Sequence, residues 1–432
     1  MKNKIILNLL FAIGCISAQA DIVVPGANGT DGALNITADT VIDLSQAPTG
    51  TWDQDNSAKA GKGVYDPEKW AVVFKYTGIN IASGAMVTFK NNASRAPVVW
   101  LVSGDVTIAG TVDLSGESMG NYWSTDLRGN RLAEPGPGGF RGGAAWRGGD
   151  VLHSAGFGPG GGRRAPWDGR WDARVGTVGG FGTTLGDPNG PRYGNPSLLP
   201  LIGGSGGAGA LINWSEGAPG GAGGGALLIA STKEISMPYG GQILALGGSG
   251  QAGGSGGGIR ILCDQLNGSG NLNAAGAPSS GSGRIRLERV GTSGALTIIP
   301  APSVIDLSSG SSAQLWPGAD APSAKILSVN SVNVAADPKA AFGSYSPDVA
   351  LPLVSQVEVI VETVNVESAS QVFVRITPRN GMTVAGTAKT DATEIAAVVD
   401  QEVSTNPLKL RWKATLPTLM GHSALQARVI RP

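Results

Sequence analysis

Short strand-like runs recur in this chain at nearly constant spacing, and glycine separates them. Residues 71–74 (AVVF) and 97–100 (PVVW) lie 26 positions apart, and two further short runs follow each. The same three-run unit returns after a long glycine-rich stretch, starting near residues 226, 259 and 284. Strands this short cannot bury their apolar side chains alone, so we expect each unit to stack on the next around a continuous core. The pattern predicts an all-β chain that opens with a right-handed parallel β-helix, or β-solenoid.

Alternation within the later units predicts which side chains face this core. The inward positions are Leu227, Ile229, Ile259, Ile261, Ile285 and Leu287. Arg260, Arg284 and Arg286 alternate with them, which predicts a strand with one wet outer face. The glycine runs before these strands fit sharp corners that need positive φ or close backbone approach. Flexible linkers are the alternative interpretation of these runs.

The uneven distribution of glycine divides the chain. Of the 68 glycines, 41 lie between Gly136 and Gly258, whereas four lie between residues 320 and 432. This change predicts a domain boundary near residues 300–322, where prolines also cluster. Longer alternating runs beyond it favour a β-sandwich, immunoglobulin-like on strand number alone. We therefore expect a signal at 1–20, β-helix rungs at 21–117, a Gly/Trp/Arg-rich insert at 118–222, further rungs at 223–310 and the sandwich at 322–432.

The first twenty residues have the three zones of a secretory signal. Lys2 and Lys4 precede an apolar stretch at 5–16, and Ala18 and Ala20 supply the small residues before a cleavage site. The stretch is shorter than the roughly 20 apolar residues that span a bilayer. We expect an exported protein, extracellular or at the cell surface, with no transmembrane segment in the mature chain. A periplasmic location and a lipoprotein anchored through Cys15 are the alternatives.

Composition excludes several kinds of chemistry. Without the signal, Cys263 is the single cysteine and no internal disulfide can form. The 32 basic residues lose two signal lysines and become 30, against 32 acidic residues, so charge gives no reason to expect nucleic acid. His153 and His422 are the only histidines, which disfavours a His-based zinc site or a Ser-His-Asp triad. The sequence indicates no metal and no cofactor.

The insert concentrates tryptophan and arginine. Five of the ten tryptophans lie in it. A flat indole face and a forked guanidinium together suit sugar rings and acidic polysaccharides. The candidate ligand-binding residues are Trp146, Trp167, Trp171, Arg163, Arg164 and Arg170. The alternative is that these side chains lie over the flank of the β-helix and fix the insert in place.

Two carboxylates in the densest part of the insert are weak catalytic candidates. Asp168 and Asp172 lie four residues apart in Trp167–Asp172, and such a pair could act as acid and base in glycoside hydrolysis. An arginine close to each would lower its pKa and make it a poor proton donor. Structural pairing is the favoured interpretation, and no catalytic residue is assigned.

Six segments of the chain resemble a family of uncharacterised secreted bacterial proteins with glycine-rich bodies. The resemblance covers roughly residues 21–290 and implies a parallel β-helix outside the cytoplasm, but it carries over no activity and no catalytic residue. It rests on the segments 51–54 (TWDQ), 63–70 (GVYDPEKW), 94–116 (SRAPVVWLVSGDVTIAGTVDLSG), 134–143 (EPGPGGFRGG), 156–162 (GFGPGGG) and 198–209 (LLPLIGGSGGAG).

These patterns favour a binding protein over an enzyme. The favoured function is a secreted or cell-surface module that binds glycan or another surface, or serves a structural role, with a polysaccharide or cell-envelope component as partner. The alternative is a polysaccharide lyase or glycoside hydrolase, which rests on analogy with other β-helices. An enzyme would need acidic side chains from neighbouring rungs in one groove, and Asp105, Asp113 and Glu117 form the cluster that the early rungs offer.

Overall fold

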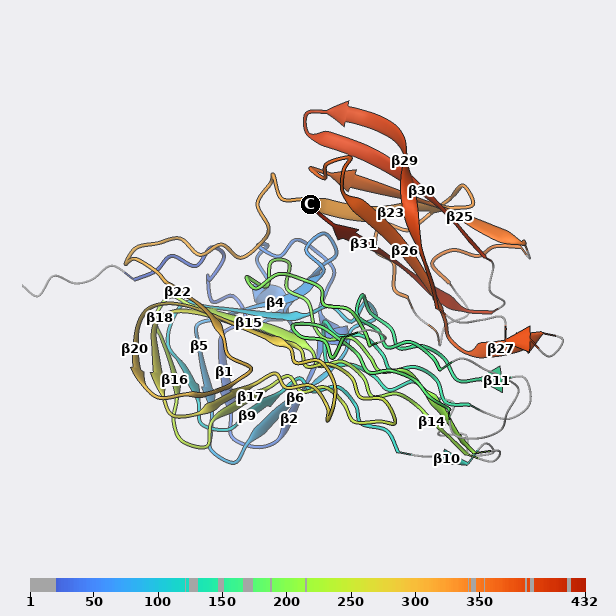
Figure 1. Cartoon of the computed structure of the whole chain (residues 1–432). Coiled ribbons are helices and arrows are strands. Elements are labelled where there is room, and N and C mark those ends of the chain that lie inside the picture. Colours follow the sequence, from blue (N-terminus) through green and yellow to red (C-terminus); the bar gives the residue numbers. More distant parts are fainter. Residues whose placement is uncertain are drawn as a thin grey trace, which may run out of the picture.

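A computed structural model of the chain shows an all-β protein with two parts (Figure 1). Curled sheets and glycine-rich segments form the first part, and a separate antiparallel sheet forms the second. Helix is confined, in the described part of the chain, to two short 3-10 turns, η1 (Leu44–Gln46) and η2 (Ser57–Lys59). The described residues are 21–120, 122–123, 131–146, 151–165, 174–186, 189–213, 216–340, 342, 347–352, 354–384, 387–388, 392–417 and 421–432.

Parallel pairing joins the predicted three-strand units. One sheet has six strands, all parallel, in the order β2 (Thr40–Asp43), β6 (Met86–Lys90), β9 (Thr111–Asp113), β17 (Gln242–Leu244), β19 (Asn271–Asn273) and β21 (Thr297–Ile299). Each strand there is the third run of one unit. The strands that the sequence predicts are therefore present, and equivalent runs lie side by side.

The first and second runs of each unit pair in an eleven-stranded sheet. The first runs are β4 (Ala71–Tyr76), β7 (Val98–Val102), β15 (Ala226–Ser231), β18 (Gly258–Gly268) and β20 (Arg284–Gly294), with β22 (Ser303–Asp306) after them. The second runs are β1 (Ala33–Ile36), β5 (Gly78–Ile81), β8 (Val106–Ile108), β16 (Glu234–Met237) and the later halves of β18 and β20. At one edge the short β3 (Val64–Asp66) pairs antiparallel with β4. These strands curl around one core.

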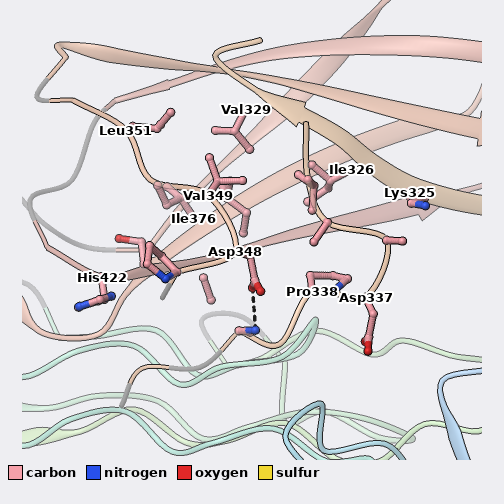
Figure 2. Close-up of a pocket in the computed structure, with 18 of the residues that line it drawn as sticks. Lys325, Ile326, Val329, Asp337, Pro338, Asp348, Val349, Leu351, Ile376 and His422 are labelled. Atoms are coloured by element: carbon pink, nitrogen blue, oxygen red, sulfur yellow. Dashed lines mark hydrogen bonds between the residues drawn. The ribbon is translucent and has the colours of Figure 1, made fainter. Parts of the chain in front are cut away.

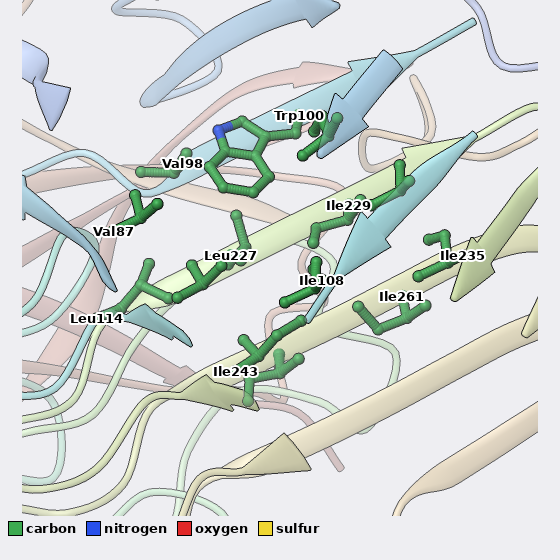
Figure 3. Packing of buried hydrophobic residues seen from close by; sticks show 14 of the residues in the cluster. Val87, Val98, Trp100, Ile108, Leu114, Leu227, Ile229, Ile235, Ile243 and Ile261 are labelled. Carbon is green, nitrogen blue, oxygen red and sulfur yellow. The ribbon is translucent and has the colours of Figure 1, made fainter. Parts of the chain in front are cut away.

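Residues at equal positions in successive units stack into apolar columns inside this core. Phe74, Trp100, Ile229, Ile261 and Leu287 are successive register partners, and all five belong to the main buried cluster. Figure 3 shows Trp100, Ile229 and Ile261 within that cluster. Full burial of one such side chain contributes about 1.5–3 kcal/mol. The inward positions predicted by alternation are confirmed, since all six lie in this cluster.

The predicted wet outer face is wrong for the first-run strands. Arg260 is 1% exposed and Arg286 is 8% exposed. A second buried cluster lies on this outer side and includes Ile22, Phe181 and Leu315, which come from segments far apart in the sequence. Alternation distinguishes the two faces of a strand, but it does not show whether another segment covers the polar face.

The glycine runs are ordered segments joined by backbone hydrogen bonds, not linkers. In residues 203–209, Gly204 and Gly207 donate to Gly224 O and Gly221 O at 2.8 and 2.9 Å. Gly206 and Gly209 donate to Phe157 O and Ser154 O at 3.0 and 2.9 Å. Residues three apart thus donate hydrogen bonds to the same neighbouring segment. This pattern is expected of an extended helix with three residues per turn and no internal hydrogen bonds.

Close backbone contact explains why these segments need glycine. A Cβ added to Gly206 would lie 1.9 Å from Arg141 O, and one added to Gly223 would lie 1.9 Å from Gly204 O. No side chain fits at such distances. We call residues 135–146, 154–165, 176–182, 202–209, 217–225, 246–257 and 275–283 the glycine bundle; Figure 1 draws most of it as green and yellow tubes beside the curled sheets.

Four strands of the insert form a small antiparallel sheet. It has the order β10 (Tyr122–Trp123), β14 (Glu216–Ala218), β13 (Ala210–Asn213) and β12 (Arg174–Val175). A second small sheet crosses between the two parts of the molecule, since β11 (Val151–Leu152) pairs with β27 (Gly381–Val384), which in turn pairs with β28 (Thr387–Ala388).

The C-terminal part is a curled antiparallel sheet of seven strands that is sandwich-like. Its order is β24 (Val332–Asn333), β23 (Ser323–Val329), β25 (Gln356–Val364), β30 (Leu408–Pro417), β29 (Thr393–Thr405), β26 (Gln371–Pro378) and β31 (Ser423–Ile430). Its core contains Val359, Val372 and Trp412. The strands predicted here are confirmed, while the immunoglobulin likeness stays a prediction. None of the helices in the described ranges has the length and apolar character needed to cross a bilayer.

Candidate functional site

The structure describes three of the predicted ligand-binding residues. Trp146 is 3% exposed and packs with Leu152 and Leu211, so its ring is covered by the protein itself. Arg164 is 5% exposed, whereas Arg163 is exposed. Trp167, Arg170 and Trp171, with the catalytic candidates Asp168 and Asp172, lie outside the described residues.

Two hydrogen bonds join the segments that flank residues 166–173, one between backbone groups and one to the Thr177 side chain. Arg163 N donates to Thr177 Oγ1 at 2.7 Å, and Thr177 N donates to Arg163 O at 2.8 Å. Beyond this pair, β12 pairs with β13 in the small antiparallel sheet of the insert. Residues 163–177, which we call the Trp/Arg stretch, therefore start and end at one narrow base, and this base is anchored in the glycine bundle.

The C-terminal part docks on the glycine bundle through buried contacts. Arg375 of β26 is 8% exposed and donates from Nη1 to Gly161 O at 3.0 Å and from Nη2 to Gly156 O at 3.3 Å. The rings of Phe157 and Phe342 meet beside it, with their centroids 5.0 Å apart. Because a guanidinium bound to two glycine carbonyls has a fixed direction, these bonds set the orientation of the two parts.

A polar network joins the same domain to the curled sheets. Tyr65 Oη and Ser94 Oγ donate to Asp337 Oδ1 at 2.7 and 3.2 Å, and Lys339 forms an ion pair with Asp337. Partial burial raises the pKa of Asp337, but the hydrogen bonds from Lys339, Tyr65 and Ser94 outweigh it, so the pKa lies below its usual value. Burial, together with the nearby Asp337 carboxylate, raises the pKa of Tyr65. The network therefore holds Asp337 ionised and Tyr65 protonated.

Above this network, a cleft of about 1070 Å³ opens between the two parts. Its apolar wall comes from the antiparallel sheet and the segment before β25, and includes Ile326, Val329, Val349, Leu351 and Ile376, as Figure 2 shows. Pro67, Glu68 and Trp70 close the side toward the curled sheets.

The best-placed acid in this cleft is already used by the backbone. Asp348 accepts hydrogen bonds from Lys339 N and Ala340 N at 2.7 and 2.8 Å, one of which is dashed in Figure 2. This carboxylate therefore shapes the loop that carries Lys339.

The remaining candidate chemistry is structural where the structure describes it. Asp113 accepts from Ser115 N at 2.8 Å, and Glu117 pairs with Arg131, so these acids hold turns together. Burial raises the pKa of the Cys263 thiol well above its usual value, which keeps it unreactive. Within the described ranges, no three His, Cys, Asp or Glu side chains come together as they would to hold a metal ion.

No family model matches the chain, and neither the curated proteins nor the solved structures contain a significant match to it. The resemblance to secreted glycine-rich bacterial proteins therefore stays a prediction. Function has to be argued from the molecule's own geometry.

Proposed function

We propose that this protein is exported and works at the cell surface or outside the cell as a binding module for acidic polysaccharide. In this proposal the curled sheets are a right-handed parallel β-helix that serves as a rigid scaffold. The glycine bundle carries the Trp/Arg stretch, and the C-terminal domain docks against both. The signal-like residues 1–20 support export.

Parallel stacking of three-strand units supports the β-helix. Equivalent strands from five successive units pair in register, and one apolar core runs through all of them. The sheets curl around this core, as the stacking of short-strand repeats requires. Such a scaffold can present an extended surface without moving.

The observation that carries the binding proposal is the anchored base of the Trp/Arg stretch. The reciprocal bonds between Arg163 and Thr177 hold its two ends together. A binding stretch on a rigid base loses less conformational entropy when it meets its ligand than one on a flexible linker. Tryptophan and arginine at 163–171 then supply stacking and charge-assisted bonds to an acidic glycan.

A glycan array tests the proposed function directly. We expect the mature chain, residues 21–432, to bind acidic glycans, and the double variant Trp167→Ala, Trp171→Ala to bind them about tenfold more weakly, because the stacking of sugar rings on the two indoles is lost. Trp316→Phe is the matched tryptophan control, since Trp316 is partly buried and packs against the second buried cluster. An array without any acidic hit contradicts the proposal.

The same hits separate binding from catalysis. We expect a polysaccharide that binds to be recovered at its original length after prolonged incubation. The acids that the early units offer are tied up in turns and ion pairs, as at Asp113 and Glu117. Release of shorter or unsaturated oligosaccharides would instead establish the enzyme alternative.

A further inference from the structure

A second, smaller cavity of about 220 Å³ lies where the curled sheets, the glycine bundle and the C-terminal domain meet. It shares Trp70, Pro338, Ala340 and Phe342 with the larger cleft, so the two spaces adjoin. Its volume suits one sugar ring better than a chain, and the adjoining cleft gives a longer ligand a way out.

Aromatic rings form the walls of this cavity. Trp70 and Phe140 face each other with centroids 6.5 Å apart and planes tilted by 30°. Trp70 Nε1 donates to Ser94 O at 3.1 Å, which fixes the indole plane. Phe157 and Phe342 line the opposite part. Flat rings held in place are the surfaces on which the C–H faces of sugars stack.

All the charged side chains that line the cavity are cationic: Arg95, Arg141 and Lys339. Arg95 Nε and Arg141 Nε bind opposite oxygens of Glu134 at 3.0 and 2.7 Å. Lys339 is paired with Asp337. The partner carboxylates Glu134 and Asp337 do not line the cavity themselves.

Each arginine also keeps hydrogen-bonding capacity. Their Nη1 groups donate to Ala93 O and Ala340 O, both at 3.2 Å. Neither Nη2 group has a hydrogen bond to a residue in the described ranges. A bound carboxylate would use these donors.

Three of the eight non-glycine residues with positive φ in the described ranges line the same cavity. Trp70, Arg95 and Ala340 have φ values of 46°, 53° and 45°, in the left-handed region that residues with a side chain rarely adopt. All three line the cavity. Strained residues persist where the surrounding structure over-determines them, and they cluster at ligand sites.

One buried acceptor completes the site. Gln426 of β31 lines the cavity, and its Oε1 is buried without a hydrogen-bond donor among the described residues. An unpaired buried acceptor is unfavourable, and a ligand hydroxyl would satisfy it.

We propose that this cavity is a subsite for one acidic sugar residue, a uronate, whose carboxylate binds between Arg95 and Arg141, whose ring stacks on Trp70, and whose hydroxyl donates to Gln426. The inference rests on the proposed function and adds a site to it. Aromatic walls without the cations would suit a neutral sugar, and the cations without the walls would suit a simple anion.

Calorimetry with defined oligosaccharides tests the subsite. The probes are oligomers of galacturonate, of alginate and of hyaluronan, each beside a neutral oligomer of the same length. We expect a uronate oligomer to bind in preference to its neutral counterpart. Arg141→Gln should weaken this binding about tenfold, the loss of one charge-assisted bond, while Lys90→Gln should leave it unchanged because that side chain is 64% exposed and outside the cavity.

Gln426 provides a second test that leaves the arginines intact. Gln426→Glu adds a negative charge to the cavity, which repels an anionic sugar and should abolish binding, whereas Gln426→Ala removes only the acceptor of the sugar hydroxyl and should weaken binding by a few-fold. Thermal unfolding of each variant shows whether it is folded. A folded Gln426→Glu variant that binds uronate normally would sink the proposal.

The two binding proposals fail in different ways. If Trp167→Ala, Trp171→Ala abolishes binding and Arg141→Gln and Gln426→Glu do not affect it, the subsite is wrong and the proposed function stands. If every uronate oligomer fails to bind the unmodified chain while the array gives other acidic hits, the subsite alone is wrong; if the array gives no acidic hit either, both are wrong. Binding of neutral and acidic oligomers with equal affinity overturns the subsite alone.

Discussion

Glu288 is a buried carboxylate that two arginines share. Its side chain is 9% exposed, and Oε1 lies 2.8 Å from Arg260 Nε and 3.2 Å from Arg286 Nε. Arg260 Nη2 also donates to Gln314 O at 2.6 Å, which links the sheet to the segment that covers it. Breaking such a group leaves uncompensated buried charge, which costs more than the intact group contributes.

We expect Glu288→Gln to lower the free energy of unfolding by about 3–5 kcal/mol. Two guanidinium groups would then be buried together without a carboxylate. Denaturant unfolding measures the loss. Asp306→Asn is the matched control, since Asp306 is 79% exposed beside Arg289, and its removal should cost less than about 1 kcal/mol. Equal losses of unfolding free energy in the two variants would contradict a larger contribution from the buried Glu288 group.

Neighbouring residues of one strand show what alternation can and cannot predict. Alternation identified Ile259 and Ile261 as core residues because neighbours on a strand always point to opposite faces. It placed Arg260 in solvent, although Arg260 is 1% exposed. The covering residues Ile22 and Leu315 are distant in sequence, and no local pattern brings them there.

At the scale of elements, the glycine bundle follows from a triplet. Residues 203–209 read GGSGGAG and residues 220–225 read GGAGGG. The third position holds Ser205, Ala208 or Ala222, each buried, and the two glycines between them meet neighbouring backbones. A repeat of three residues matches three residues per turn. The triplet is present in the sequence, but a corner role for glycine does not predict segments that pack side by side.

Alanine at one glycine of the bundle tests this packing. We expect Gly206→Ala to destabilise the protein by about 1–3 kcal/mol, because the new methyl group meets the Arg141 carbonyl. Gly120→Ala is the control, since an added Cβ there meets nothing within 4 Å. Thermal unfolding of both variants measures the difference. Tolerance of alanine at Gly206 would mean that the segments are not held in close contact.

At the scale of the molecule, the junction between the two parts should depend on pH. Asp337 is the carboxylate at that junction, and its pKa in the folded protein lies below the value of 3.8 for the free group. A carboxyl group with a lowered pKa stabilises the folded form above its unfolded pKa. That stabilisation is lost as the pH falls from 3.8 through the folded value.

We expect the junction to weaken as the pH falls from 3.8 through the lowered pKa of Asp337. Protonated Asp337 loses its ion pair with Lys339, and its hydrogen bonds from Tyr65 and Ser94 become weaker. Small-angle scattering, together with proteolysis at residues 307–322, measures the opening. Asp337→Asn should show the same opening already at pH 7, whereas Asp306→Asn should not. A junction that is equally protected at pH 3 and pH 7 contradicts the expectation.

Of the two candidate sites, one could be found from the sequence and the other could not. Tryptophan and arginine are dense in residues 163–171, so composition alone pointed to that stretch. The small cavity joins Trp70, Arg95, Arg141 and Gln426 from four separate regions. The sequence carries no signal that these four residues meet, because the curled sheets, the glycine bundle and the C-terminal domain bring them together.

Residue order alone determined the strands, their inward side chains and the change of character near residue 320, because period-2 alternation, glycine placement and strand length are local properties of the chain. Tertiary structure decided which polar faces are covered, how glycine segments pack and where cations and rings converge. Those outcomes depend on contacts between segments that can be more than 200 residues apart, such as Arg375 with Gly161, and such contacts have no local pattern to announce them.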